Sequence, residues 1–217
     1  MNKLIVVSGG FRTGSTVVFN LCRELMLKKN PACESGGVPL LIAMERVLET
    51  DYVLKAHNVH TPFTEKILHV HTVRDPLEVA VSLKLLRERL QKAPFPTSGW
   101  FSIIQKVRDA MECTSILKRR GGVAFIEYEA ILSSLIGVAT SIARFLDVDL
   151  GPRGIAKIVR KYTLQEVTEY CDKIDEVCEV TQYRQVHIGP YQGRTNEKVR
   201  EHLPQRIADE LRGFRTK

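Results

Sequence analysis

Three short segments combine glycine, hydroxyl and basic residues in a way that could bind phosphate and move a proton. The first segment, residues 8–16 (SGGFRTGST), follows an apolar run. The second is Lys55-Ala56-His57, and the third begins at Arg74 and includes Ser82, eight residues further on. Glycine lets backbone N–H groups approach an anion, arginine and lysine neutralise its charge, and histidine titrates near neutral pH. These residue types predict a site for a phosphorylated ligand.

The glycine-rich segment differs from a nucleoside-triphosphate loop at one position. Gly9 and Gly14 have the G-x-x-x-x-G spacing of a P-loop, and Thr16 stands where its Ser or Thr would be, but position 15 is Ser instead of Lys. The cation in the turn is Arg12. We therefore expect a phosphate cradle without the lysine that acts on the β- and γ-phosphates. A purely structural turn between a strand and a helix is the alternative.

Four histidines lie close together in the sequence. Lys55 and His57 project to the same side of a predicted strand end, where they could bind an anion and accept a proton; a solvated strand end is the alternative. His69 and His71 also share a side and could hold a metal. No H-E-x-x-H or comparable ligand frame accompanies them, so we expect no metal.

The elements that must position these residues alternate between apolar strands and amphipathic helices. Strands are predicted near residues 3–8, 51–55, 67–73 and 122–127, with residues 33–37 as a loop. Helices are predicted near residues 15–29, 39–48, 76–90, 101–118, 131–146, 152–161, 164–177 and 196–214. This order predicts an α/β fold, a doubly wound and mostly parallel sheet flanked by helices, with the ligand at the carboxyl ends of the strands.

Composition narrows the class of protein. The 217 residues carry 44% hydrophobic and 26% charged side chains and predict a single domain over residues 1–217. The net charge of +7 suits an anionic ligand. Five scattered cysteines without a C-x-x-C pair argue against a disulfide framework. No stretch is typical of a membrane span or a signal peptide, so we expect a cytoplasmic protein.

With these motifs in order, the chain resembles the sulfotransferases that use 3′-phosphoadenosine 5′-phosphosulfate (PAPS). Residues 11–16 look like the loop that binds the 5′-phosphosulfate, and Lys55-Ala56-His57 looks like the family's K-x-H. Arg74-Asp75-Pro76 through Ser82 is similar to the 3′-phosphate motif, including its spacing, and Glu127-Tyr128-Glu129 is similar to a Y-E motif near the adenine. The resemblance implies a P-loop-like sulfotransferase architecture and a single sulfotransferase-like domain.

The resemblance also implies roles for individual residues. His57 would accept the proton of an acceptor hydroxyl or amine, while Lys55 and Arg12 would stabilise charge on the leaving phosphate. The residues implied in cofactor binding are Arg12, Thr13, Gly14, Ser15, Thr16, Arg74, Ser82 and Tyr128. The expected cofactor is PAPS, with 3′-phosphoadenosine 5′-phosphate (PAP) as its product, and the expected partner is a small-molecule or glycan acceptor.

Two parts of the resemblance leave alternatives. The family's C-terminal Arg-Lys-Gly is His187-Ile188-Gly189 here, and Arg184 or Arg194 would have to substitute. Residues 30–34 (NPACE) resemble a segment of tyrosylprotein and some carbohydrate sulfotransferases that places a catalytic glutamate there, so Glu34 is the rival base.

Other functions stay open beside transfer of a sulfuryl group. One is a P-loop-type kinase of nucleotides or small molecules, and another is a homologue that binds the cofactor without catalysis. A nucleic-acid-binding module is suggested only by the net charge, because the basic residues are spread along the chain. We expect neither a nucleic-acid nor a membrane partner, and a homodimer remains open.

Overall fold

A five-stranded parallel sheet forms the centre of the computed structural model, which describes residues 2–57, 67–171 and 201–214. The strands are β1 (Leu4–Gly9), β2 (Glu34–Gly36), β3 (Tyr52–Lys55), β4 (Ile67–Val73) and β5 (Val123–Glu127), in the spatial order β2-β3-β1-β4-β5. All four pairings are parallel. The predicted α/β class with a parallel sheet is therefore confirmed.

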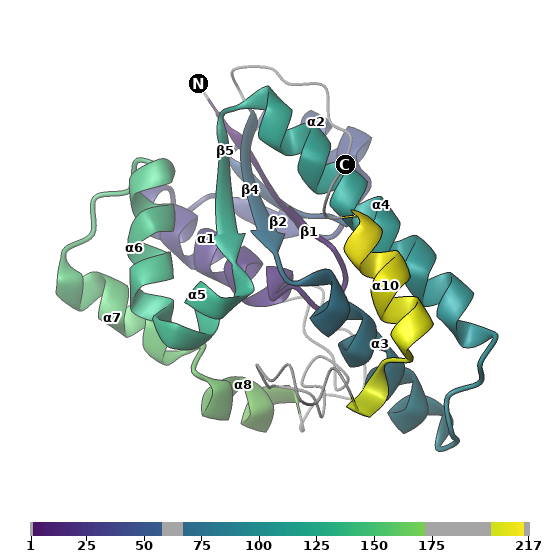
Figure 1. Cartoon of the computed structure of the whole chain (residues 1–217). Helices are drawn as coiled ribbons and strands as arrows, with labels where there is room; N and C mark the ends of the chain where they lie inside the picture. Colours follow the sequence, from purple (N-terminus) through teal and green to yellow (C-terminus); the bar gives the residue numbers. More distant parts are fainter. Residues whose placement is uncertain (1, 58–66, 172–200, 215–217) are drawn as a thin grey trace.

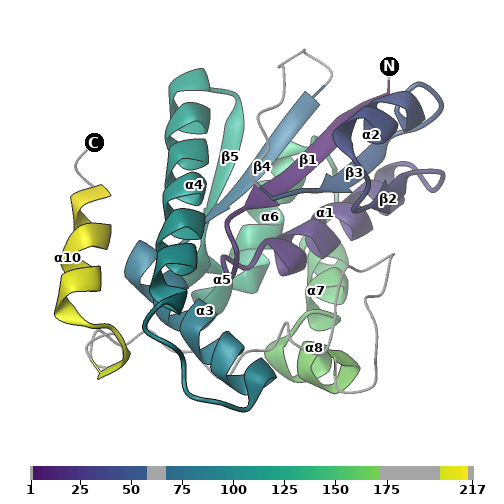
Figure 2. The same cartoon turned by 90° about the vertical axis from the view of Figure 1, so that its right-hand side faces the viewer.

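Helices cover both faces of this sheet (Figures 1 and 2). One face carries α1 (Ser15–Lys29), α6 (Leu135–Phe145) and α7 (Pro152–Arg160), with α5 (Tyr128–Ser133) and α8 (Leu164–Cys171) beside them. The other carries α2 (Leu40–Arg46) and α4 (Gly99–Arg120), and α3 (Pro76–Gln91) and α10 (Gln205–Gly213) pack against α4. The carboxyl ends of the strands all point to one edge, as a parallel sheet requires.

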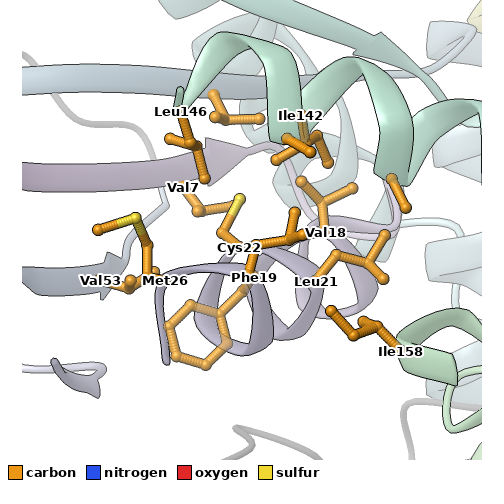
Figure 3. Packing of buried hydrophobic residues seen from close by; sticks show 14 of the residues in the cluster. Val7, Val18, Phe19, Leu21, Cys22, Met26, Val53, Ile142, Leu146 and Ile158 are labelled. Carbon is orange, nitrogen blue, oxygen red and sulfur yellow. The ribbon is translucent and has the colours of Figure 1, made fainter. Parts of the chain in front are cut away.

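The central strand and the first helix share the main core. Every residue of β1 is buried, because this strand has a neighbour on each side and helices on both faces. Val7 of β1 packs against Cys22 and Val18 of α1, and Ile142 of α6 closes the layer (Figure 3). This packing fixes the amino end of α1 directly beyond the carboxyl end of β1.

The structure corrects three element boundaries. Residues 34–36, predicted as loop, form the edge strand β2, whose three residues are too few to show an alternating pattern. The helix predicted over residues 131–146 divides at Ser134, where an extended φ of −155° ends α5 and the side chain caps α6 by accepting from the Gly137 N–H. Tyr128, predicted at a strand end, begins α5.

Some predictions fall on parts of the chain outside the described residues. These are the end of the helix predicted to residue 177, the C-terminal loop with His187-Ile188-Gly189, Arg184 and Arg194, and the start of the last helix. In the part that is described, no helix is both long and apolar enough to cross a bilayer.

Candidate phosphate-binding site

The turn between β1 and α1 has a backbone that glycine makes accessible. Gly14 has a φ of 82°, in the left-handed region, and an added Cβ would lie 2.7 Å from Ile131 Cδ1. Gly14 also occupies the N-cap position of α1 and provides no side chain to cap it. The N–H groups in the first turn of a helix have no acceptor within the helix. The turn thus presents backbone donors and the positive end of the α1 dipole at one place.

Threonines tie the turn to the neighbouring strand. The Thr13 hydroxyl donates to the Gly10 carbonyl at 2.8 Å and lies 2.7 Å from the Thr72 hydroxyl of β4. Thr72 in turn donates to the Ser8 carbonyl at 3.2 Å. An added Cβ at Gly9 would lie 2.0 Å from Thr72 Oγ1, so this position requires glycine for the close approach of β4. Thr72 of β4 is a contact of the turn that the motifs in the sequence did not indicate.

The structure brings Arg12, Arg74 and Ser82 together. Arg12 has a φ of 65°, which is unfavourable for a residue with a Cβ. Its carbonyl accepts a hydrogen bond from Arg74 Nη1 at 3.0 Å, and its Nε donates to Ser82 Oγ at 3.1 Å. Burial lowers the pKa of Arg12, and the charge of Arg74 adds to that lowering. Two guanidinium groups therefore lie at one end of the turn, although 62 residues separate them in sequence.

Arg74 is oriented from two further directions. Its Nε donates to Glu78 Oε2 at 3.0 Å, one helical turn along α3. The guanidinium carbon lies 3.9 Å from the centre of the Tyr128 ring, a cation–π contact. The arginine side chain is only 2% exposed. Glu78, which the sequence analysis did not single out, could have been found from its i, i+4 spacing to Arg74.

Lys55 and His57 lie at the other side of the turn, at the end of β3. The register pairs Val7 of β1 with Lys55, so the lysine ends beside the turn. Its Nζ donates to the Thr16 hydroxyl. His57 Nδ1 lies 3.2 Å from the Gly9 carbonyl oxygen, and its ring stacks on Phe11. Lys55 and His57 thus contact the same turn as Arg12, Arg74 and Thr13.

The hydrogen bond to Gly9 determines which nitrogen of His57 can act as a base. A carbonyl oxygen only accepts, so Nδ1 must donate, and the proton of the neutral ring lies on Nδ1. Nε2 then carries the lone pair. The contact therefore selects the form of His57 in which Nε2 accepts a proton.

Glu34 lies elsewhere in the sheet. It pairs in register with Tyr52, three residues before Lys55 on β3, and its carboxylate forms an ion pair with Arg46 at 3.1 Å. A rise of about 3.3 Å per residue places it roughly 10 Å short of the strand end. Glu34 is thus set back from the turn that His57 contacts.

His69 and His71 both point at one buried serine. Ser8 Oγ lies 2.6 Å from His69 Nε2 and 2.7 Å from His71 Nδ1. His71 Nε2 lies 2.9 Å from the hydroxyl of Thr114, which donates to the Ala110 carbonyl. Thr114 therefore accepts from His71, Ser8 donates to His71, and His69 donates to Ser8. Among the described residues, no three His, Cys, Asp or Glu side chains gather as a metal site needs.

A cavity of about 840 Å³ adjoins the turn on the side of α4. The ends of β4 and β5, with Arg74 and the start of α3, line it, and it reaches the turn at Gly10 and Thr13. Among the described residues, its lining includes neither Lys55 nor His57.

Comparison with known proteins identifies the fold of this chain. No protein-family model matches the sequence, and no curated protein is similar enough to count as a match. Several solved structures are similar. Mouse sulfotransferase SULT7A1 complexed with PAP has a TM-score of 0.64 at 18% identity, covering 97% of this chain and 83% of its own. Retinol dehydratase, in complex with androsterone and the inactive cofactor PAP, has a TM-score of 0.62 at 14% identity, covering 98% of this chain and 79% of its own.

A bacterial structure extends the similarity. Sulfotransferase STF9 from Mycobacterium avium has a TM-score of 0.50 at 13% identity, covering 96% of this chain and 76% of its own. At these identities the likeness concerns the backbone. The chain has the sulfotransferase fold.

Proposed function

We propose that this protein is a sulfotransferase that moves a sulfuryl group from PAPS to a hydroxyl or amine. The observation that carries the proposal is the convergence of three basic side chains on one glycine turn. Arg12 belongs to the turn, Arg74 comes from the end of β4, and Lys55 comes from the end of β3. A ligand with phosphate groups at two separated positions suits such an arrangement, and the sulfotransferase fold agrees with it.

The residues present fit PAPS. The backbone donors of the turn, with Arg12 and Thr16, would hold the 5′-phosphosulfate. Arg74 and Ser82 would hold the 3′-phosphate: the Ser82 hydroxyl accepts the Arg12 Nε–H, so its own proton can be donated to a phosphate oxygen. The Tyr128 ring lies against Arg74 and offers an aromatic surface for the adenine.

The chemistry of the chain's own residues follows from their positions. PAPS, when bound, supplies the sulfuryl group and a phosphate leaving group. His57 takes the proton of the acceptor at Nε2, while the Gly9 carbonyl holds the proton on Nδ1. Lys55 and Arg12 stabilise the negative charge that develops on the leaving phosphate. Each well-placed donor of this kind contributes about 3–4 kcal/mol to lowering the barrier.

The contact between Lys55 and Thr16 favours this proposal over a kinase. In a P-loop enzyme the hydroxyl at the position of Thr16 binds Mg²⁺. Here that hydroxyl accepts a hydrogen bond from an ammonium group, which takes the place of the metal charge. We therefore expect binding of PAP to be independent of Mg²⁺.

Calorimetric titration with PAP, ATP and 5′-AMP tests the binding half of the proposal. We expect micromolar binding of PAP without Mg²⁺, much weaker binding of 5′-AMP, and a loss of at least tenfold in PAP affinity on Ser82→Ala or Arg74→Ala. Arg153→Ala, at an exposed position of α7, is the matched control and should change nothing. Equal or tighter binding of ATP would contradict the proposal.

Release of PAP from PAPS in the presence of a panel of alcohols, phenols, amines and sugars tests the transfer half. We expect His57→Gln to slow transfer by about 100-fold or more, in line with the loss of a general base, while Glu34→Gln has little effect. If Glu34→Gln abolished transfer and His57→Gln did not, the assignment of the base would be wrong. Tight PAP binding with no transfer would indicate a homologue without catalytic activity.

A further inference from the structure

Phe11, in the middle of the turn, contacts the imidazole of His57. The two rings stack with centroids 4.7 Å apart and an angle of 19° between their planes. His57 itself is exposed, so packing from other sides restrains its ring less than it would restrain a buried histidine. A flat stack of this kind limits rotation of the imidazole about its side-chain bonds.

Phe11 is itself held in place by the opposite part of the fold. Its ring packs on the edge of the apolar cluster formed by α3, α4 and α10. Lys106 of α4 places its Nζ 4.6 Å from the centre of the ring, a cation–π contact. The aromatic side chain is therefore anchored to α4 while its ring lies against His57.

We propose that Phe11 is a positioning residue for His57: together with the Gly9 carbonyl it holds the imidazole in one orientation and one tautomer, with the lone pair on Nε2. The function of this positioning rests on the proposed role of His57 as the base. The turn would then have two tasks. Its backbone and Arg12 bind the phosphosulfate, and Gly9 and Phe11 hold the group that accepts the proton.

The tautomer gives this proposal a readout that needs neither cofactor nor acceptor. A free imidazole in water favours the proton on Nε2, whereas the contact with Gly9 requires it on Nδ1. Long-range ¹H–¹⁵N correlation spectra of the ¹⁵N-histidine-labelled full chain distinguish the two forms by the shifts of the ring nitrogens. The His57 signals are assigned by their loss in His57→Gln.

We expect the neutral His57 ring to be the Nδ1–H form in the unmodified chain, with its ring protons shifted upfield by Phe11. Phe11→Leu should remove the ring shift and turn the tautomer ratio toward the Nε2–H form, while Phe11→Tyr should preserve both. The matched control is Phe125→Leu, because Phe125 makes an edge contact with His71, 5.8 Å between centroids. That variant should disturb the His71 signals and leave those of His57 unchanged.

Steady-state kinetics of the Phe11 variants provide a second test of the proposal. With an accepted substrate, Phe11→Leu should lower kcat about tenfold with little change in the KM for PAPS, and Phe11→Tyr should restore it. His57 signals that do not respond to Phe11→Leu would overturn the inference even if transfer is observed. If the signals respond but no acceptor or PAPS is ever turned over, the positioning by Phe11 stands and the proposed function fails.

Discussion

Lowering the pH from 7.5 to 5.5 should destabilise the folded chain through His69 and His71. Both side chains are buried, with exposed fractions of 0% and 1%. Burial lowers the pKa of each to about 4, and the neighbouring His69 adds to the effect on His71. Their hydrogen bonds to Ser8 are made by neutral rings. The two imidazoles therefore bind protons more readily in the unfolded chain than in the folded chain.

The sign and size of the effect follow from proton linkage. The unfolded chain, with an ordinary histidine pKa of about 6.5, takes up protons as the pH falls through that value, and the folded chain does so only near pH 4. Stability is therefore full above about pH 7 and falls as the pH drops toward 4. Between pH 7.5 and 5.5 each histidine removes about 1.3 kcal/mol, and the pair about 2.7 kcal/mol. This value barely depends on the exact folded pKa, provided that it lies below about 5.

Urea unfolding at pH 7.5, 6.5 and 5.5 measures this loss, because carboxylates with ordinary pKa values hardly titrate in that range. His71→Gln should halve the pH dependence of the free energy of unfolding. His57→Gln is the matched control, since His57 is exposed, and should keep the full dependence. If His71→Gln does not fold, NMR titration of the unmodified chain replaces it.

The reasoning would be refuted by a free energy of unfolding that changes by less than about 1 kcal/mol between pH 7.5 and 5.5. It would also be refuted if the ring signals of His69 or His71 titrated near pH 6.5 in the folded chain. Either result would mean that the rings are hydrated or paired with an acid. The hydrogen bonds around Ser8 would then not be buried as they are in the structure.

Three further predictions concern the turn, a helix cap and the thiols. Gly14→Ala should lower the free energy of unfolding by about 1–2 kcal/mol in urea titrations, because its φ of 82° is unfavourable for alanine and the Cβ meets Ile131. Asp75→Ala should cost about 1 kcal/mol by the same measurement, and Asp75→Asn less, because the Asp75 carboxylate accepts from the Leu77 N–H at 2.8 Å as the cap of α3. Cys33, whose pKa burial raises to about 12, should resist iodoacetamide at pH 8 in the native chain and react in urea, as followed by peptide mass spectrometry.

The parts of the fold that local sequence signals determine were predicted well. The apolar run before Gly9 and the glycines after it describe β1 and the turn, and Asp75-Pro76 marks the start of α3 within one residue. Each of these signals depends on a few adjacent residues. The edge strand β2 was missed for the same reason: its residues form a strand because β3 lies beside them, and their own pattern does not indicate it.

The contacts that build the site were harder to predict, because they depend on the order of the strands. Nothing local to Ser8 indicates that two histidines more than 60 residues away will both point at its hydroxyl. The contact follows from the pairing of β4 with β1, because their register places Ser8 opposite His71. Phe11 and His57 meet for the same reason, through β3 on the other side of β1.

Lys55 supplies, from another strand, the positive charge that the glycine-rich loop lacks at position 15. Position 15 lacks the lysine of a P-loop, yet β3 pairs with β1 in parallel register and delivers Lys55 to the Thr16 hydroxyl of α1. The substitution has a chemical consequence. A lysine within the loop can only stabilise the phosphates, whereas a lysine at the end of β3 lies two residues from His57. The group that would stabilise the leaving phosphate and the group that would take the acceptor's proton are then both positioned by the end of β3.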